Sequence, residues 1–216
     1  MKNLILVPTV LEANHLLGRE MNGEEQSHGI QTPVGTWALC GVGPAAAAFS
    51  AQRWIAALAP ERLILAGIGG AFPQSALKPG QIHQAESEVF ADLGFQTPER
   101  FVNLDAMGLP VLQQGMKTLG CTYPCHLLDE GASAVAFATV SRLTTCPAQA
   151  ALFYTTYEAS IENMEGAGVA MVCAFHGLPF CQVRSVSNLV GPRDPSTWLI
   201  AEPLRRLGEW LNERLS

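Results

Sequence analysis

The feature that most constrains the fold is a pair of adjacent apolar segments within residues 158–194. Residues 167–177 are rich in Ala, Gly and Met and end at Gly177, which is typical of a buried helix with a glycine C-cap. Residues 178–186 follow at once, between that glycine and a turn-rich segment, and this pattern predicts a buried strand. Such a helix–strand unit is a building block of α/β proteins.

Two polar residues stand at the ends of these segments. Glu165 lies at the start of the predicted helix, and Asn188 lies at the carboxyl end of the predicted strand. Ligands of open α/β sheets bind at strand ends of this kind, so both side chains are candidates for a pocket. The alternative for Asn188 is structural, with the side chain capping the turn that follows it.

The rest of the chain alternates between strand-like and helix-like segments, and no linker or repeat interrupts it. The strands expected are residues 3–7, 36–40, 62–66, 132–140 and 178–186, with an irregular strand region at 81–95. The helices expected are residues 9–17, 44–58, 148–157, 167–177 and 196–215, with a surface loop at 97–110. We therefore expect residues 1–216 to form one three-layer α/β/α domain with a central mixed, largely parallel sheet.

Composition and charge exclude several classes of function. Hydrophobic residues make up 48% of the 216-residue chain and charged residues 15%, which suits a compact domain with a sizeable core. The net charge is −6 and the 13 basic residues are scattered, so we expect neither a nucleic-acid partner nor an anionic membrane surface. No apolar run is long enough for a membrane span, and we expect no targeting signal.

The six cysteines follow no even framework, so we expect reduced cysteines and a cytoplasmic protein. The run from Cys121 to Cys125 and His126 has no second pair of ligands, and we therefore expect no metal site. The pattern assigns no role to His83, His126 or His176.

Two glycine motifs each follow a predicted strand. Gly41-Val-Gly43 and Gly67-Ile-Gly-Gly70 match neither the dinucleotide fingerprint nor a Walker A loop. Each is explained either by a tight strand-to-helix turn or by a ligand that approaches the backbone closely.

Glu12 also has two interpretations. Thr9 and Glu12 form a capping-box pattern, in which the Glu12 side chain folds back on the Thr9 N–H. The turn after the first strand is, however, expected at the same sheet edge as Asn188, which makes Glu12 a candidate catalytic carboxylate.

Five motifs in this order resemble the purine nucleoside phosphorylase and nucleosidase superfamily over nearly the whole chain. They are Glu12 after the first strand, Gly41-Val-Gly43, Ala66-Gly-Ile-Gly-Gly-Ala71, Asn163-Met-Glu165-Gly-Ala167 and Arg184-Ser-Val-Ser-Asn188. The resemblance implies that superfamily's fold, a small-molecule purine nucleoside as substrate and no cofactor. It also implies a homo-oligomer, a dimer or a tetramer, because sites in this superfamily commonly borrow residues from a neighbouring subunit.

Within the superfamily, a resemblance to the methylthioadenosine/adenosylhomocysteine nucleosidases assigns individual roles. It implies that Glu165 binds the ribose hydroxyls, that Met164 packs on the sugar and that Glu12 activates the attacking water. Further substrate contacts are expected at Gly69, Gly70 and Val140.

Those nucleosidases carry Asp where this chain has Asn188, and this difference indicates which purine base is the leaving group. A 6-oxopurine presents an acceptor at O6 and a protonated N7, and an Asn amide can donate to the first and accept from the second. A carboxylate facing O6 would instead oppose two acceptors and leave buried polar groups unpaired. Asn188 therefore indicates hypoxanthine or guanine as the leaving base.

The nucleophile is expected to be water. Phosphorolysis needs an anion site, but the glycine segment at 66–70 carries no Arg, Ser or Thr, and the first Arg after Glu12 is Arg19. Hydrolysis of a 6-oxopurine riboside resembles the reaction of the futalosine hydrolase family, as do the residues at 67–72 and 187–194. The resemblance implies cleavage of futalosine to dehypoxanthine futalosine and hypoxanthine in menaquinone biosynthesis.

Three alternatives stay open at this point. Arg193 either binds the carboxylate tail of the substrate or stabilises a turn with Asp194. The chain could also be an adenine-directed nucleosidase or a phosphorylase, which Asn188 and the use of phosphate distinguish. A non-catalytic nucleoside-binding protein is the third reading, and the presence of both Glu12 and Glu165 argues against it.

Overall fold

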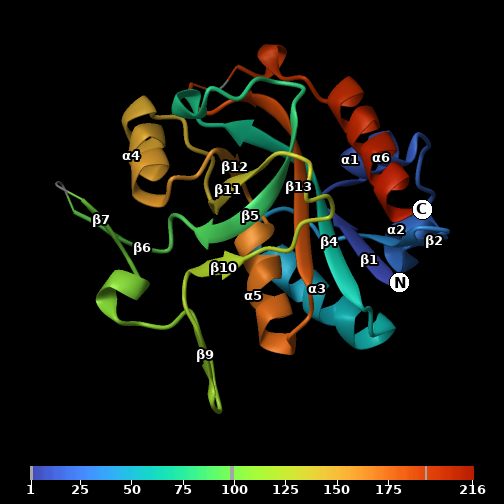
Figure 1. The fold of residues 1–216 in the computed structure, drawn as a ribbon, viewed down its shortest axis with the longest axis horizontal. Coiled ribbons are helices and arrows are strands. Elements are labelled where there is room, and N and C mark those ends of the chain that lie inside the picture. The colour runs from blue at the N-terminus through green and yellow to red at the C-terminus, as the bar shows by residue number, and fades with distance from the viewer. Residues whose placement is uncertain (1, 98–99, 193) are drawn as a thin grey trace.

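The computed structural model describes residues 2–97, 100–192 and 194–216, which form a mixed β-sheet flanked by helices (Figure 1). The main sheet consists of β1 (Asn3–Val7), β2 (Ile30–Thr32), β3 (Gly35–Leu39), β4 (Arg62–Ala71), β5 (Ile82–Phe90), β10 (Thr122–Pro124), β11 (Ala134–Thr139), β12 (Ile161–Asn163) and β13 (Phe180–Leu189). The helices are α1 (Val10–Leu17), α2 (Gly23–His28), α3 (Pro44–Leu58), α4 (Pro147–Tyr157), α5 (Gly166–His176) and α6 (Ala201–Leu215). Two small hairpins extend from this body, β6 (Gly94–Gln96) with β7 (Phe101–Asn103) and β8 (Leu112–Gln114) with β9 (Lys117–Leu119).

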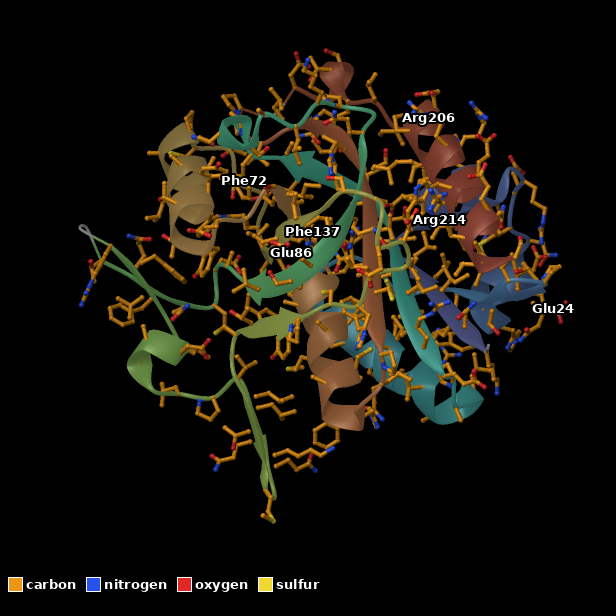
Figure 2. All side chains as sticks on the ribbon, viewed as in Figure 1. Glu24, Phe72, Glu86, Phe137, Arg206 and Arg214 are labelled. Carbon is orange, nitrogen blue, oxygen red and sulfur yellow. The ribbon has the colours of Figure 1, made fainter. Side chains whose placement is uncertain are left out.

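Alternate residues of the central strands enter two apolar cores on opposite faces of the sheet. Leu4 and Leu6 of β1 pack in the core covered by α3, α4 and α5, whereas Ile5 and Val7 pack in the core covered by α1 and α6. This is the side-chain alternation of a strand buried on both faces. Side chains such as those of Glu24 and Arg206 lie at the periphery of the molecule, while Phe137 lies at its centre (Figure 2).

Part of the sheet closes on itself. Strand β13 pairs with β4 in parallel and with β5 antiparallel, while β12 pairs with β11 in parallel and with β4 antiparallel. Because β5 also pairs with β11, the five strands β4, β13, β5, β11 and β12 form a closed ring. Its interior holds a small apolar cluster formed by Ala71, Ala85, Phe137, Ile161 and Val186. The α/β class and the mixed sheet are confirmed, but the prediction of three layers did not include this closure.

The glycine motif at residues 67–70 was expected to end a strand, and that expectation was wrong. Strand β4 continues through these glycines to Ala71, because β12 and β13 both pair with this part of it. A Cβ at Gly69 would lie 2.6 Å from Ile161 Cγ2, so the close passage of β12 leaves no room for a side chain there. Glycine is therefore required by the ring itself.

Two other expectations need correction, the surface loop at 97–110 and the start of the last helix. Residues 97–110 contain β7 and a 3₁₀ turn at Asp105–Met107, whereas residues 82–90 form one strand whose expected irregularity is a register shift against β11. Helix α6 begins at Ala201 rather than at 196, with Pro203 in its first turn, where a missing N–H costs no helical hydrogen bond.

Candidate active site

A pocket of about 400 Å³ opens at the carboxyl ends of β1, β4 and β13, beside the start of α5. Its lining includes six residues that the sequence predicted: Glu12, Gly69, Gly70, Met164, Glu165 and Asn188. Val140 lies apart from it, fully buried in the apolar core under α4 and α5. Arg193 lies outside the residues that the structure describes.

Glu12 is held by both sides of the pocket. Its Oε1 accepts the Ile68 N–H at 3.0 Å, and its Oε2 accepts the Thr9 hydroxyl at 2.7 Å. Thr9 caps α1 by accepting the Glu12 N–H, but the carboxylate is not folded back on the Thr9 N–H as a capping box requires. Burial raises the pKa of Glu12, and the hydrogen bonds from Ile68 and Thr9 together with the Arg184 charge only partly offset this. A raised carboxyl pKa suits a group that takes up a proton near neutral pH.

Glu165 forms a buried ion pair that the sequence reasoning missed. Its Oε2 lies 3.0 Å from Nη2 of Arg184, and the Arg184 side chain is only 1% exposed. The Gly43 N–H points to the other oxygen at 3.3 Å, which gives the Gly41–Gly43 motif a function at the site. An Arg within an otherwise apolar strand pattern was the available signal, because a charged residue is rarely buried without a partner.

Asn163 fixes the position of Glu165. Its side-chain oxygen accepts the N–H groups of Glu165 and Gly166 at 3.0 and 2.7 Å, so it occupies the first donors of α5. Its amide nitrogen donates to Glu88 at 2.8 Å, which ties the start of α5 to the interior of the ring.

Gly67 lets Glu12 and Arg184 approach the same point. A Cβ at this position would lie 2.6 Å from Glu12 Oε1 and 2.9 Å from Arg184 Nη1. Either charged side chain would have to move to make room. The glycine therefore sets the spacing between the candidate base and the ion pair of Glu165.

Asn188 presents one free donor and one free acceptor. Its Nδ2 donates one hydrogen to the Leu189 carbonyl at 2.9 Å, and its Oδ1 accepts from the Ser187 hydroxyl at 2.7 Å. A carbonyl can only accept, so the amide nitrogen must be the atom beside Leu189, which fixes the orientation of the amide. One N–H and one lone pair remain for a ligand.

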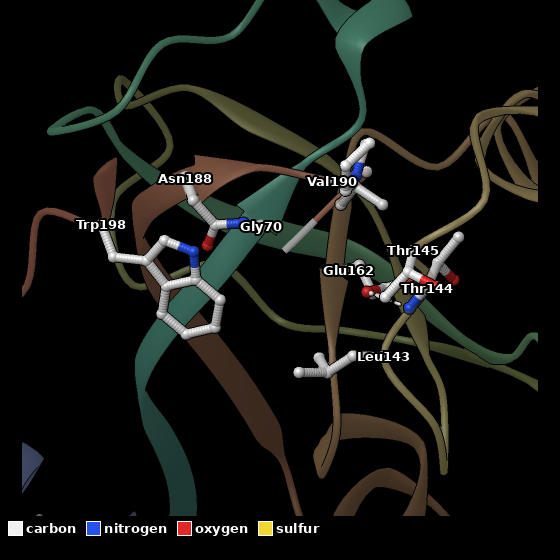
Figure 3. A pocket seen from close by; sticks show the side chains of 10 residues that line it. Gly70, Leu143, Thr144, Thr145, Glu162, Asn188, Val190 and Trp198 are labelled. Atoms are coloured by element: carbon white, nitrogen blue, oxygen red, sulfur yellow. Dashed lines mark hydrogen bonds between the residues drawn. The ribbon is translucent and has the colours of Figure 1, made fainter. Parts of the chain in front are cut away.

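A small recess of about 40 Å³ adjoins the pocket beyond Asn188 (Figure 3). Its lining includes Gly70, Glu162 and Trp198, which also line the larger pocket. Glu162 Oε1 accepts the Thr144 N–H at 3.2 Å. Burial raises the pKa of Glu162, and the Thr144 hydroxyl and the Thr144 N–H only partly offset this.

Glu88, inside the ring, is fully buried, and burial raises its pKa to about 7. Its unfolded-state value is near 4.5, so between these values the folded protein binds more protons than the unfolded chain. The stability that this proton contributes is lost as the pH rises. We therefore expect the free energy of unfolding to fall by up to roughly 3 kcal/mol between about pH 4.5 and 7 from this group.

Urea unfolding of the wild type and of Glu88→Gln at several pH values checks this expectation, with Glu24→Gln on the exposed α2 as the control. The free energy of unfolding of Glu88→Gln should fall less as the pH rises, whereas that of the control should fall as in the wild type. Equal slopes in all three proteins would contradict the assignment.

Within residues 2–97, 100–192 and 194–216, no cluster of three or more His, Cys, Asp or Glu side chains could hold a metal ion. All six cysteines are free. The described part of the chain contains no helix long and apolar enough to cross a membrane.

The chain is similar to known proteins over most of its length. The sequence matches the phosphorylase superfamily over residues 4–212. It is 38% identical to the futalosine hydrolase of Streptomyces coelicolor over 178 residues, which cover 77% of this chain and 72% of that protein. It is 30% identical to the futalosine hydrolase of Thermus thermophilus over 220 residues, which cover 99% of this chain and 95% of that protein.

Solved structures with the same fold include two from Helicobacter pylori. A methylthioadenosine/adenosylhomocysteine nucleosidase superposes with a TM-score of 0.76 at 16% identity, covering 100% of this chain and 98% of that one. A futalosine hydrolase superposes with a TM-score of 0.75 at 16% identity, covering 100% and 97%. The chain therefore belongs to the phosphorylase superfamily and, within it, to the futalosine hydrolases.

Proposed function

We propose that the protein is an N-ribosidic hydrolase that cleaves futalosine to dehypoxanthine futalosine and hypoxanthine. The observation that carries the proposal is the convergence of Glu12, Glu165 and Asn188 on one pocket in a chain of this family. The Glu12 carboxylate can take a proton from water, and the Glu165 carboxylate can bind the ribose hydroxyls. Asn188 is an amide with one donor and one acceptor free.

In this mechanism the bond between C1′ and N9 breaks and its electron pair goes to the purine. Water forms the new bond to C1′, and Glu12 takes the proton that the water loses. Glu165 accepts hydrogen bonds from the ribose hydroxyls, and its negative charge favours the cationic sugar of the transition state. N7 takes up a proton from solvent as the bond breaks, and Asn188 donates to O6 and accepts from this N7–H, which stabilises the departing base.

The charges at the pocket support water rather than phosphate as the nucleophile. Among the described residues that line it, Arg184 is the one cation. Its guanidinium already donates to Glu165, to the Ile68 carbonyl and to Asn163. An added phosphate would therefore meet the carboxylates without a free positive charge to bind it.

One incubation tests the reaction and its alternatives. The protein is supplied in turn with futalosine, inosine and methylthioadenosine, with and without phosphate, and the released base is identified. We expect hypoxanthine from futalosine at a rate that phosphate does not change. Release of adenine alone, or a rate proportional to phosphate, would replace the proposal by an adenine-directed nucleosidase or a phosphorylase.

The proposal extends to the setting of the enzyme. Its reaction would serve menaquinone biosynthesis, as the resemblance implies, and six free cysteines are consistent with a reducing cytoplasm. A homo-oligomer is supported by the apolar side chains of Val42, just before α3, and Phe49, within α3, which are 52% and 72% exposed. Val42 also lines the pocket, so a neighbouring subunit on this face would lie beside the substrate.

Asn188→Asp is expected to shift the preference from 6-oxopurine to 6-aminopurine nucleosides. The carboxylate would oppose O6 of the base and also the Leu189 carbonyl that the amide now donates to. We expect the hypoxanthine substrate to lose roughly 2–4 kcal/mol of transition-state stabilisation, with a smaller gain for its 6-amino analogue. The measurement is kcat/KM for both nucleosides on both proteins. An unchanged ratio would mean that Asn188 does not read the base.

A further inference from the structure

The two strands that flank Gly70 each place a polar side chain opposite it. Glu162 of β12 pairs with Gly70 on one side, and Asn188 of β13 pairs with the same residue on the other. Figure 3 shows the two side chains on either side of Gly70, with the Trp198 ring beside Asn188. Because Gly70 has no side chain, the space between Glu162 and Asn188 stays open toward the pocket.

One carboxylate oxygen of Glu162 forms no hydrogen bond with the described residues. The residue is 4% exposed, and Oε1 is occupied by the Thr144 N–H at 3.2 Å. Oε2 is buried and has no hydrogen-bond partner among the described residues. A buried acceptor without a donor costs on the order of 1–3 kcal/mol, and at the wall of a pocket a ligand can supply the donor. The mechanism above uses Glu162 for nothing else.

We propose that Glu162 is a second base-reading residue, whose Oε2 accepts the N1–H of the departing 6-oxopurine while Asn188 serves O6 and N7. This assignment deepens the proposed function and rests on it for the identity of the base. In a 6-oxopurine N1–H is the donor next to O6, and O6 is itself next to the N7 edge. Two readers on opposite sides of one glycine therefore match consecutive groups along a single edge of the base.

Glu162 would also discriminate against adenine. N1 of a 6-aminopurine carries no hydrogen, so an ionised Oε2 would face a lone pair there. A donor at Oε2 favours the ionised form, as the Thr144 N–H does at Oε1, and so opposes the effect of burial on this group. The 6-oxopurine thus stabilises the charge state that binds it, and the 6-aminopurine does not.

Glu162→Gln gives an informative test because Thr144 fixes which atom faces the pocket. The Thr144 N–H needs an acceptor, so the amide oxygen takes the place of Oε1 and the NH₂ group takes the place of Oε2. A donor then faces N1–H of hypoxanthine, but it matches the bare N1 of adenine. We expect kcat/KM for futalosine to fall about 10²-fold, and that of its 6-amino analogue to change less than tenfold or to rise.

Exposed Glu86→Gln on β5 is the matched control and should leave the ratio of the two substrates unchanged. If Glu162 only supported the Thr144 loop, Glu162→Gln would lower kcat/KM equally for both substrates. An unchanged ratio in Glu162→Gln would therefore overturn the assignment.

A second measurement needs neither the variant nor turnover. Calorimetric titration of the wild type with hypoxanthine and with 1-methylhypoxanthine compares a base that has N1–H with one that lacks it. We expect at least tenfold weaker binding of the methylated base. Equal affinities would overturn the assignment even if Glu162→Gln failed to fold.

The two proposals fail separately. If the wild type does not release hypoxanthine from futalosine, the proposed reaction is wrong, although the Glu162-dependent preference for bases with N1–H can still be measured by titration. Suppose instead that the wild type hydrolyses futalosine, that Glu162→Gln leaves the ratio of kcat/KM for the two nucleosides unchanged, and that 1-methylhypoxanthine binds as tightly as hypoxanthine. In that case only the base-reading role of Glu162 is wrong.

Discussion

Glu12→Gln is expected to lower kcat by on the order of 10²-fold or more while the fold is retained. The amide oxygen can still accept the Ile68 N–H, and the amide nitrogen can donate to the Thr9 hydroxyl, so the local hydrogen bonds survive. What the variant loses is the ability to take a proton from water. Measurement of kcat for futalosine, together with thermal unfolding of both proteins, separates these effects.

Exposed Glu20→Gln, shortly after α1, is the control and should match the wild type. Turnover by Glu12→Gln at the wild-type rate would reduce Glu12 to a structural partner of Thr9 and Ile68. A fall in rate that follows a loss of stability would point to the same conclusion.

Glu165→Gln is expected to reduce both activity and stability. The Arg184 guanidinium, 1% exposed, would lose its counter-charge and remain buried. Removal of one partner from a buried ion pair typically costs about 3–5 kcal/mol, and the neutral amide recovers part of this by accepting one hydrogen bond. We also expect kcat/KM to fall by about 10² to 10³, because the charge that favours the ribose hydroxyls and the cationic transition state is gone.

Two comparisons distinguish the ribose-binding role from the structural one. Glu165→Gln should lower kcat/KM less for a 2′-deoxyribosyl substrate than for the ribosyl substrate, since the deoxy substrate lacks a hydroxyl for Glu165 to bind. The double variant Glu165→Gln/Arg184→Met should regain stability relative to Glu165→Gln without regaining activity. Equal losses on both substrates would remove the ribose-binding role.

The sequence predicted the three polar residues of the site because each lies at a boundary that local patterns define. Glu12 follows a strand, Glu165 begins a helix, and Asn188 precedes a turn-rich segment. Parallel strands bring such boundaries to one edge of a sheet, so their convergence needed no knowledge of distant contacts.

The features that the sequence did not predict depend on pairing between distant strands. Glu162 lies in a three-residue strand that is too short to show a period, and its position opposite Gly70 follows from antiparallel pairing with β4. Arg184 is counter-charged by a residue 19 positions earlier, on the helix that precedes its strand. The ring closes only because β13 reaches β5, and no local pattern in either strand specifies that partner.

The closed ring divides the pocket wall into a rigid part and an adjustable part. Gly69, Gly70, Glu162 and Asn188 all belong to strands of the ring, and each of these strands has a hydrogen-bonded neighbour on both sides. Leu11 and Ile200 belong instead to α1 and to the segment before α6, which lie outside the ring, where the Leu199 N–H donates to the Ser187 carbonyl of β13. On the proposed assignments, the purine would meet a wall whose shape is set before it arrives, whereas the remainder of the nucleoside would meet side chains outside the ring, which can shift more easily to admit groups of different size. An enzyme built in this way should be strict about the base and tolerant at the 5′ position.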